Sequence, residues 1–77
     1  MTIEPVRRLH RAQPFEPFSL RLADGGELTV DHPEFLAVSP VGRTISVAQP
    51  DGSFDIVDLL LVTSLHVGNG KKKPRKR

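Results

Sequence analysis

The sequence contains no cysteine, tryptophan or tyrosine, and its four phenylalanines are its only aromatic residues apart from histidine. Without cysteine, neither a disulfide framework nor a thiolate metal site can add stability. No stretch approaches the roughly 20 apolar residues that a membrane-spanning helix needs. The first residues also lack the basic start and apolar run of a secretion signal. These absences predict a cytoplasmic protein that does not contact a membrane.

The chain is short, with 77 residues, so it can form one domain at most. A chain of this length buries a smaller share of its surface than a longer one does. Self-association would cover part of the surface that stays exposed, and we therefore expect a homo-oligomer.

The charges divide the chain into two parts. Residues 71–77 hold six of the eleven basic side chains and no acidic one. Residues 1–70 hold five arginines against nine Asp and Glu residues, a net charge of −4. Because Gly68-Asn69-Gly70 is a flexible spacer and like charges repel, we predict a folded domain over residues 1–67 and a disordered basic C-terminal tail over residues 68–77.

The first residues predict a short helix that Thr2 is placed to cap. Apolar residues recur about once per turn, at Ile3, Val6 and Leu9. Arginines occupy the other side, at Arg7, Arg8 and Arg11. The helix must end before Pro14, because a proline pushes the preceding residue out of helical geometry. Phe15 and Phe18 then follow in an extended segment and are expected to pack in the core.

A β-hairpin is predicted from Phe18 to Asp31, where apolar and polar residues alternate around Asp24-Gly25-Gly26. A two-residue loop would mix apolar and polar side chains on each face. A three-residue loop at Asp24-Gly25-Gly26 instead pairs Leu22 with Leu28 and Leu20 with Val30, which makes one face wholly apolar. It also puts Gly26 at the position that needs a left-handed backbone.

Further short strands are expected over residues 35–38 and 43–49, on either side of the turn Ser39-Pro40-Val41-Gly42. A loop at Pro40-Val41 sets Leu36 opposite Ile45. Pro33 should bend or end the strand that precedes them.

After the turn Pro50-Asp51-Gly52, the sequence leaves open whether Phe54 faces the core. The apolar run over residues 57–62 is consistent with a strand buried on both sides. It is also consistent with a tight helical turn begun by Asp58 before a last strand from Leu61 to Val67, and this second interpretation is preferred because residues 61–67 alternate.

This order of elements resembles that of the small SH3-like barrels, and of the Sm-like proteins in particular, over roughly residues 3–67. The likeness is carried by Phe18-Ser-Leu-Arg-Leu-Ala-Asp-Gly and by Leu60-Leu-Leu-Val-Thr-Ser-Leu-His-Val. The resemblance implies a mainly β fold, a short N-terminal helix followed by a strongly bent five-stranded antiparallel sheet. It also implies subunits that associate through their last two strands. The aromatic-Lys-His segment that lines the RNA-binding pore of the bacterial Sm-like chaperone has no counterpart at residues 56–60.

A second resemblance is to a family of short uncharacterised bacterial proteins. It rests on Pro14-Phe-Glu-Pro-Phe-Ser-Leu-Arg-Leu-Ala-Asp-Gly, His32-Pro-Glu-Phe and Ser39-Pro-Val-Gly-Arg-Thr. This likeness implies no activity.

Residues that could support catalysis or metal binding are few and are not spaced for it. The three histidines lack the spacing of metal ligands, at His10, His32 and His66. The Ser64 hydroxyl would share a strand face with His66, but no carboxylate is placed to orient the imidazole. The aspartates at 51, 55 and 58 are interpreted as turn and surface residues. We therefore expect no enzyme, cofactor, metal site or small-molecule substrate.

The basic tail is the strongest functional feature. Its cations are Lys71, Lys72, Lys73, Arg75, Lys76 and Arg77. Neutralising six phosphates of duplex DNA would give log affinity a slope of roughly −5 against log salt. The sequence thus predicts a non-enzymatic, self-associating protein that binds RNA or DNA independently of base sequence, helped by Arg7, Arg8 and Arg11. The alternative is a protein-interaction or assembly module in which the tail is accessory.

Overall fold

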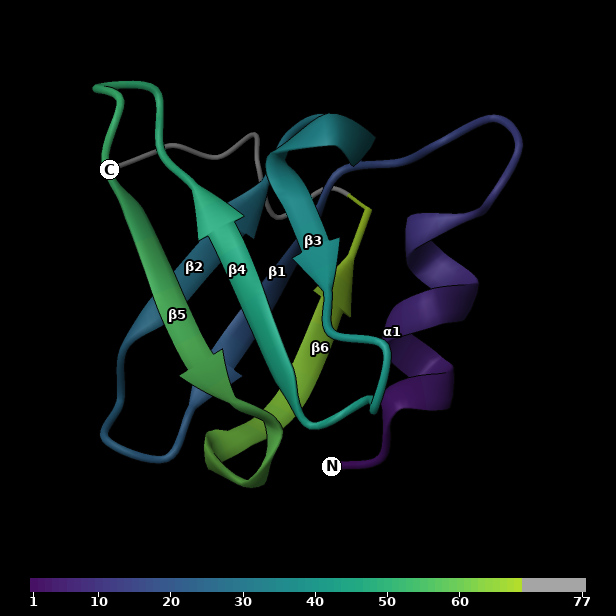
Figure 1. The fold of residues 1–77 in the computed structure, drawn as a ribbon. Coiled ribbons are helices and arrows are strands. Elements are labelled where there is room, and N and C mark those ends of the chain that lie inside the picture. Colours follow the sequence, from purple (N-terminus) through teal and green to yellow (C-terminus); the bar gives the residue numbers. More distant parts are fainter. Residues whose placement is uncertain (69–77) are drawn as a thin grey trace.

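The computed structural model describes residues 1–68, which form one helix, six strands and two single-turn 3₁₀ helices (Figure 1). The elements in chain order are α1 (Ile3–His10), β1 (Phe18–Leu22), β2 (Glu27–Val30), η1 (Pro33–Phe35), β3 (Leu36–Val38), β4 (Thr44–Ala48), β5 (Phe54–Asp58), η2 (Leu59–Leu61) and β6 (Val62–Val67). Apart from Gly68, the predicted tail lies outside the described residues.

Two antiparallel three-stranded sheets make up the body, in the orders β2-β1-β6 and β3-β4-β5. This confirms a mainly β fold with a short N-terminal helix. Residues 1–68 hold six strands in two sheets, whereas the sequence predicted five strands in one bent sheet. Pro33 begins η1, which separates β2 of one sheet from β3 of the other. The residue has no N–H to donate to a ladder, so the strand ends there, as expected.

The core is made of side chains from both sheets and from α1. Ten hydrophobic residues of the described chain are buried: Val6, Phe18, Leu20, Val30, Leu36, Ile45, Val47, Val57, Leu59 and Val62. The ring of Phe15 packs at a tilt against that of Phe18, with centroids 6.0 Å apart, which confirms the packing role expected of these two rings. Val6 is completely buried and attaches α1 to the rest of the core.

The first hairpin has the predicted apolar face but not the predicted register. Leu20 lies opposite Leu28, and Phe18 lies opposite Val30. The predicted pairs, Leu22 with Leu28 and Leu20 with Val30, are therefore wrong by two residues. A shift of two residues keeps every side chain on the same face, so burial alone cannot distinguish the two registers.

The loop of this hairpin accounts for the shift. The Leu22 N–H donates to the carbonyl of Gly26 at 2.8 Å, so the loop is Ala23-Asp24-Gly25. Gly25, with φ of 92°, takes the left-handed conformation that was predicted for Gly26. The Asp24 carboxylate accepts from the Gly26 N–H at 2.8 Å and thereby closes the loop one residue early.

The turn between β3 and β4 shows the same kind of shift. The Gly42 N–H donates to the Ser39 carbonyl at 2.8 Å, which confirms the predicted turn. Leu36 lies opposite Val47, however, and Val38 opposite Ile45, so the predicted pairing of Leu36 with Ile45 is wrong by two residues. The Ser39 N–H donates to the Thr44 carbonyl, which leaves a loop of four residues, 40–43.

The remaining strands settle two open points. Phe54 lies opposite Ala48 and its side chain is 62% exposed, so it faces away from the core. The predicted tight turn before the last strand is confirmed as η2, where the Asp58 carboxylate accepts from the Leu60 N–H at 2.9 Å. The expected alternation along the last strand is interrupted, because β6 bulges at Thr63 between the pairs of β1 with Val62 and Ser64.

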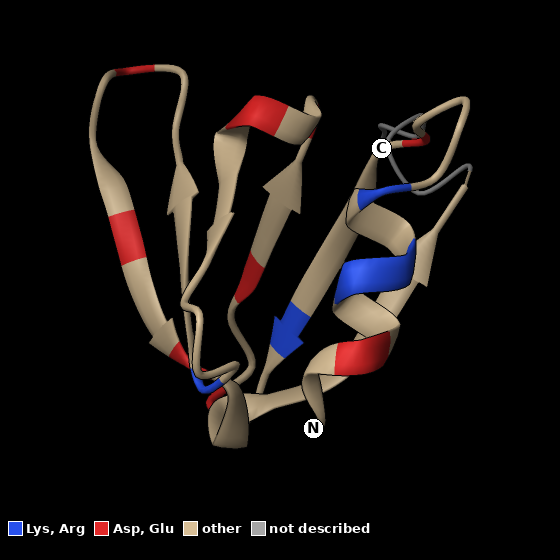
Figure 2. Cartoon of the chain, turned by 45° about the vertical axis from the view of Figure 1, so that its right-hand side comes forward, with Lys and Arg blue, Asp and Glu red and all other residues tan. Residues whose placement is uncertain are grey.

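Charge is unevenly distributed over this fold. Residues 1–11 carry three arginines and one glutamate, whereas residues 12–68 carry two arginines and eight acidic residues. Figure 2 shows acidic positions along β5 and at the turns, with basic positions on α1. Figure 1 places β5 and α1 on opposite sides of the molecule. The described body therefore has a basic side at α1 and is acidic elsewhere.

Candidate nucleic-acid interface

The arginines of the basic side are oriented by the apolar side of α1. Val6 is buried, and Ile3 and Leu9 pack against the core. Arg7, Arg8 and Arg11 consequently project from the remaining surface of the helix and its last turn. The helix forms without a side-chain hydrogen bond from Thr2, the residue expected to cap it. Cations at this end of the helix are favourable, because its carbonyl groups are unpaired there.

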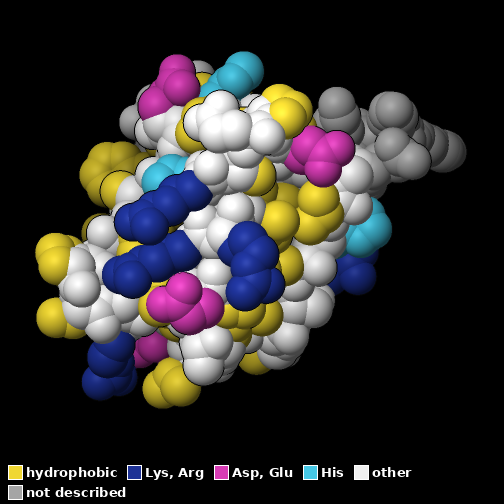
Figure 3. Space-filling model, turned by 90° about the vertical axis from the view of Figure 1, so that its right-hand side faces the viewer, with side chains coloured by type: hydrophobic (Ala, Val, Ile, Leu, Met, Phe, Trp, Pro, Cys, Tyr) yellow, Lys and Arg dark blue, Asp and Glu magenta, His cyan; other side chains and the backbone are white. Residues whose placement is uncertain are grey.

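Two hollows bring these arginines together. The first, of about 330 Å³, is lined by Glu4, Arg7, Arg8 and Arg11. The second, of about 380 Å³, lies between α1 and the β3–β4 turn and is called the helix groove below. It is lined by Arg7, His10, Arg11, Val38, Ser39 and Pro40. Figure 3 shows basic side chains gathered over α1, with one acidic side chain among them.

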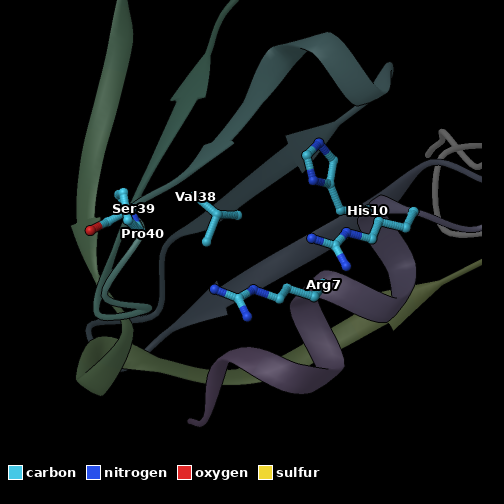
Figure 4. A pocket seen from close by; sticks show the side chains of 6 residues that line it. Arg7, His10, Val38, Ser39 and Pro40 are labelled. Carbon is cyan, nitrogen blue, oxygen red and sulfur yellow. The ribbon is translucent and has the colours of Figure 1, made fainter.

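The helix groove has two chemically different walls. Figure 4 shows Arg7 extending from α1 toward Val38 and the β3–β4 turn, with His10 one turn further along the same side of the helix. The opposite wall is aliphatic at Val38 and Pro40, while the Ser39 hydroxyl points away from Arg7. None of the described residues that line the helix groove is acidic.

The charge of Arg7 is weakly compensated. Its Nη1 atom is 3.9 Å from the Glu4 carboxylate, and the Glu4 side chain is 72% exposed. Such a solvated pair contributes little. The Arg7 side chain itself is only 32% exposed, so packing restricts its motion.

His10 is held by a hydrogen bond to a residue that is distant in the sequence. Its Nε2 atom is 2.8 Å from the carbonyl oxygen of Pro33 at the start of η1. Because a carbonyl only accepts, Nε2 carries the hydrogen and Nδ1 of the neutral ring is an acceptor. From the sequence, His10 was excluded only as a metal ligand, and neither this contact nor its place in the helix groove was predicted.

The basic tail residues 71–77 lie outside the described residues. The described chain ends just after β6, and Figures 1 and 2 both place that end of β6 and the last turn of α1 toward the same end of the molecule. Arg7, Arg8 and Arg11 together line the hollow of about 330 Å³.

The aspartates at 51, 55 and 58 act as turn and surface residues, as predicted. Asp51 accepts from the Ser53 hydroxyl at 2.6 Å and from the Ser53 N–H at 2.9 Å. Both hydrogen bonds lower the pKa of Asp51 below its ordinary value of 3.8, and the bond from the Ser53 hydroxyl has the larger effect. Asp55 accepts from Gln49 at 3.2 Å. Within residues 1–68, no three His, Asp or Glu side chains are grouped so that they could hold a metal ion.

Sequence reasoning identified the arginines but not the groove that they line. The spacing of Arg7, His10 and Arg11 already places them on one side of a helix. The opposite wall comes from residues about 30 positions later in the sequence, and the contact between them depends on how α1 packs.

Comparison of the chain with protein-family models, curated proteins and solved structures gave no match. No helix in the part of the chain that the structure describes is long and apolar enough to cross a membrane.

Proposed function

We propose that the protein binds RNA or DNA independently of base sequence, through the basic segment 71–77 together with the arginines of α1. The observation that carries this proposal is the separation of charge. Nine of the eleven Lys and Arg residues lie in residues 71–77 or at Arg7, Arg8 and Arg11. The rest of the described body has six more acidic than basic residues, which would repel a polyanion from other faces.

The position of α1 supports joint binding by both basic regions. Lys71 follows Gly68 by three residues, which span about 10 Å at most. The end of β6 and the last turn of α1 lie toward the same end of the molecule. A single nucleic acid could therefore contact the basic segment and the helix arginines at once, and each phosphate neutralised would add to the affinity.

The chemistry of the helix groove supports binding to the backbone rather than to the bases. Among the described residues no Phe, Tyr or Trp side chain lines the groove, and the ring of His10 is tied to the Pro33 carbonyl, so a platform of large aromatic rings for stacking bases is missing. Arginine contacts to phosphate carry no sequence information by themselves. Under this proposal the protein acts in the cytoplasm and binds nucleic acid without catalysing a reaction.

We also propose that the two sheets form a small barrel and that the protein self-associates. The connection of two three-stranded sheets through η1 and η2 is consistent with a small SH3-like or Sm-like barrel. Four large apolar side chains in residues 54–61 are more than half exposed: Phe54, Ile56, Leu60 and Leu61. In the described residues β5 pairs with β4 alone, so its other edge is open to a second copy.

The proposal is tested by comparing the full chain with a variant that lacks residues 71–77. Fluorescence anisotropy would measure the binding of labelled 20-nucleotide DNA and RNA at 50 and 200 mM salt. We expect the full chain to bind more tightly than the deletion variant and to lose more affinity at the higher salt. Equal binding by both proteins would remove the basic segment from the mechanism.

The exposed apolar side chains also favour the second candidate function, a protein-interaction or assembly module. Under that function the full chain would bind neither nucleic acid at either salt concentration, and it would still self-associate. Light scattering on the same samples would show a mass above the 8.5 kDa of one chain.

A further inference from the structure

We propose that the helix groove holds one ribose-phosphate unit of an RNA backbone. The phosphate lies on Arg7 and Arg11, and the sugar lies between His10 and the aliphatic wall. This inference rests on the proposed function, and it names the ligand and the residues of one part of that interface. The volume of about 380 Å³ is within the range of small-ligand sites, which begins at about 300 Å³.

The cationic wall accounts for the phosphate. Arg7 and Arg11 are four residues apart, so their side chains lie on the same side of α1, and both line the groove. A guanidinium group presents a planar set of donors that matches two oxygens of a phosphate. Arg7 is already restricted by packing, which reduces the entropy lost when it binds. With no acidic residue among the described lining residues, an anion would also relieve the repulsion between these cations.

The opposite wall favours a phosphate that carries a sugar over a free inorganic ion. Val38 and Pro40 present only carbon atoms, and an ion as strongly hydrated as inorganic phosphate would gain nothing by facing them. The carbon-rich face of a sugar can lie against such a wall while its phosphate stays on the arginines. The groove thus matches a ligand that is anionic on one side and weakly polar on the other.

His10 makes the choice between ribose and deoxyribose. Its Nε2–H is used by the Pro33 carbonyl at 2.8 Å, which leaves Nδ1 as an acceptor in a groove otherwise supplied with donors. In Figure 4 the ring of His10 stands at the rim of the same groove as Arg7. An acceptor beside a bound phosphate can take a hydrogen bond from a sugar hydroxyl. The 2′-hydroxyl is the group that ribose has and deoxyribose lacks.

The test uses the full chain with two labelled decamers that share the same base, oligouridine with ribose and oligodeoxyuridine with deoxyribose. We expect about fivefold tighter binding of the ribose decamer, the effect of one ordinary hydrogen bond. His10→Phe should weaken binding of the ribose decamer about fivefold and leave the deoxyribose decamer unaffected. Arg7→Gln and Arg11→Gln should each weaken binding of both decamers about tenfold, as the loss of a charge-assisted bond requires.

Arg43→Gln is the matched control, because it removes the same charge from an exposed position that does not line the groove. Arg11 is exposed, so its replacement keeps the test valid even if Arg7→Gln fails to fold. Equal losses for Arg11→Gln and Arg43→Gln would refute the groove while leaving nucleic-acid binding in place. Equal binding of the two decamers would refute the ribose assignment. Failure of the full chain to bind either decamer would overturn this proposal together with the proposed function.

Discussion

Gly42 offers a direct test of the contact between α1 and the β3–β4 turn, on which the helix groove depends. Its φ of 75° is in the left-handed region, where a residue other than glycine costs about 1–2 kcal/mol. A Cβ atom at this position would lie 3.2 Å from Cγ2 of Ile3 on α1. Moving Ile3 away adds about 1 kcal/mol, the lower end of overpacking costs. We therefore expect Gly42→Ala to lower the free energy of unfolding by about 2–3 kcal/mol.

Gly25→Ala is the matched control for this substitution. Gly25 has φ of 92°, but a Cβ atom there would meet nothing within 4 Å. The expected loss is therefore the backbone cost alone, about 1–2 kcal/mol. The difference between the two variants isolates the contact between the turn and α1.

A double-mutant cycle with Ile3→Ala makes the reasoning refutable. Ile3→Ala removes the Cγ2 atom that the new Cβ would meet, so in that background Gly42→Ala should cost no more than Gly25→Ala. Urea denaturation followed by circular dichroism would give the six free energies, those of the parent, Gly42→Ala and Gly25→Ala with and without Ile3→Ala. If Gly42→Ala and Gly25→Ala cost the same in both backgrounds, α1 does not pack against the turn in solution. The helix groove would then lose one of its walls.

Three further substitutions test other parts of the account. Asp58→Ala should lower the free energy of unfolding by about 1 kcal/mol, because the Leu60 N–H loses its acceptor; an unchanged urea midpoint would contradict the capping role. Ser53→Ala should raise the pKa of Asp51 toward 3.8, because its principal hydrogen bond is lost, and NMR titration that finds no rise would contradict this cause. A carboxylate whose pKa is lower in the folded than in the unfolded state stabilises the fold at pH values above the unfolded pKa, and this contribution is lost as the pH falls through the folded pKa. Because Ser53→Ala brings the two pKa values of Asp51 closer together, the variant should lose less stability as the pH falls below 3.8. Ile56→Ser should reduce the mass in light scattering toward 8.5 kDa, and an unchanged oligomer would exclude β5 from the interface.

The sequence predicted the faces of the strands but not their pairing. Leu20, Leu28 and Val30 share one face, as expected. Both predicted registers, that of β1 with β2 and that of β3 with β4, were nevertheless displaced by two residues. Hydrophobic patterning repeats every two residues, so it is blind to such a displacement. The pairing was decided by loop hydrogen bonds, such as that of the Asp24 carboxylate, whose geometry the sequence does not specify.

The last strands show a second limit. The Asp58 turn could be predicted because its residues are local and its capping chemistry is specific. The bulge at Thr63 could not, because it depends on how β6 aligns with the distant β1. For the same reason the outward position of Phe54 was open until its partner Ala48 was known.

At the candidate site, the sequence predicted the surface of the helix but not the residues that lie across from it. Three arginines on one side of α1 follow from helical spacing alone. The part of the groove contributed by Val38 and Pro40, and the contact of His10 with Pro33, require tertiary packing. The charge of the candidate site therefore follows from the sequence, whereas its shape does not.

The most direct test of the central claim is the salt dependence of binding to a duplex DNA of arbitrary sequence by the full chain. If the six cations of residues 71–77 neutralise phosphates, the slope of log affinity against log salt should be about −5. If Arg7, Arg8 and Arg11 also take part, the slope should approach about −8. A slope near zero, or no measurable binding at low salt, would contradict the proposal that this protein holds nucleic acid by its phosphate backbone.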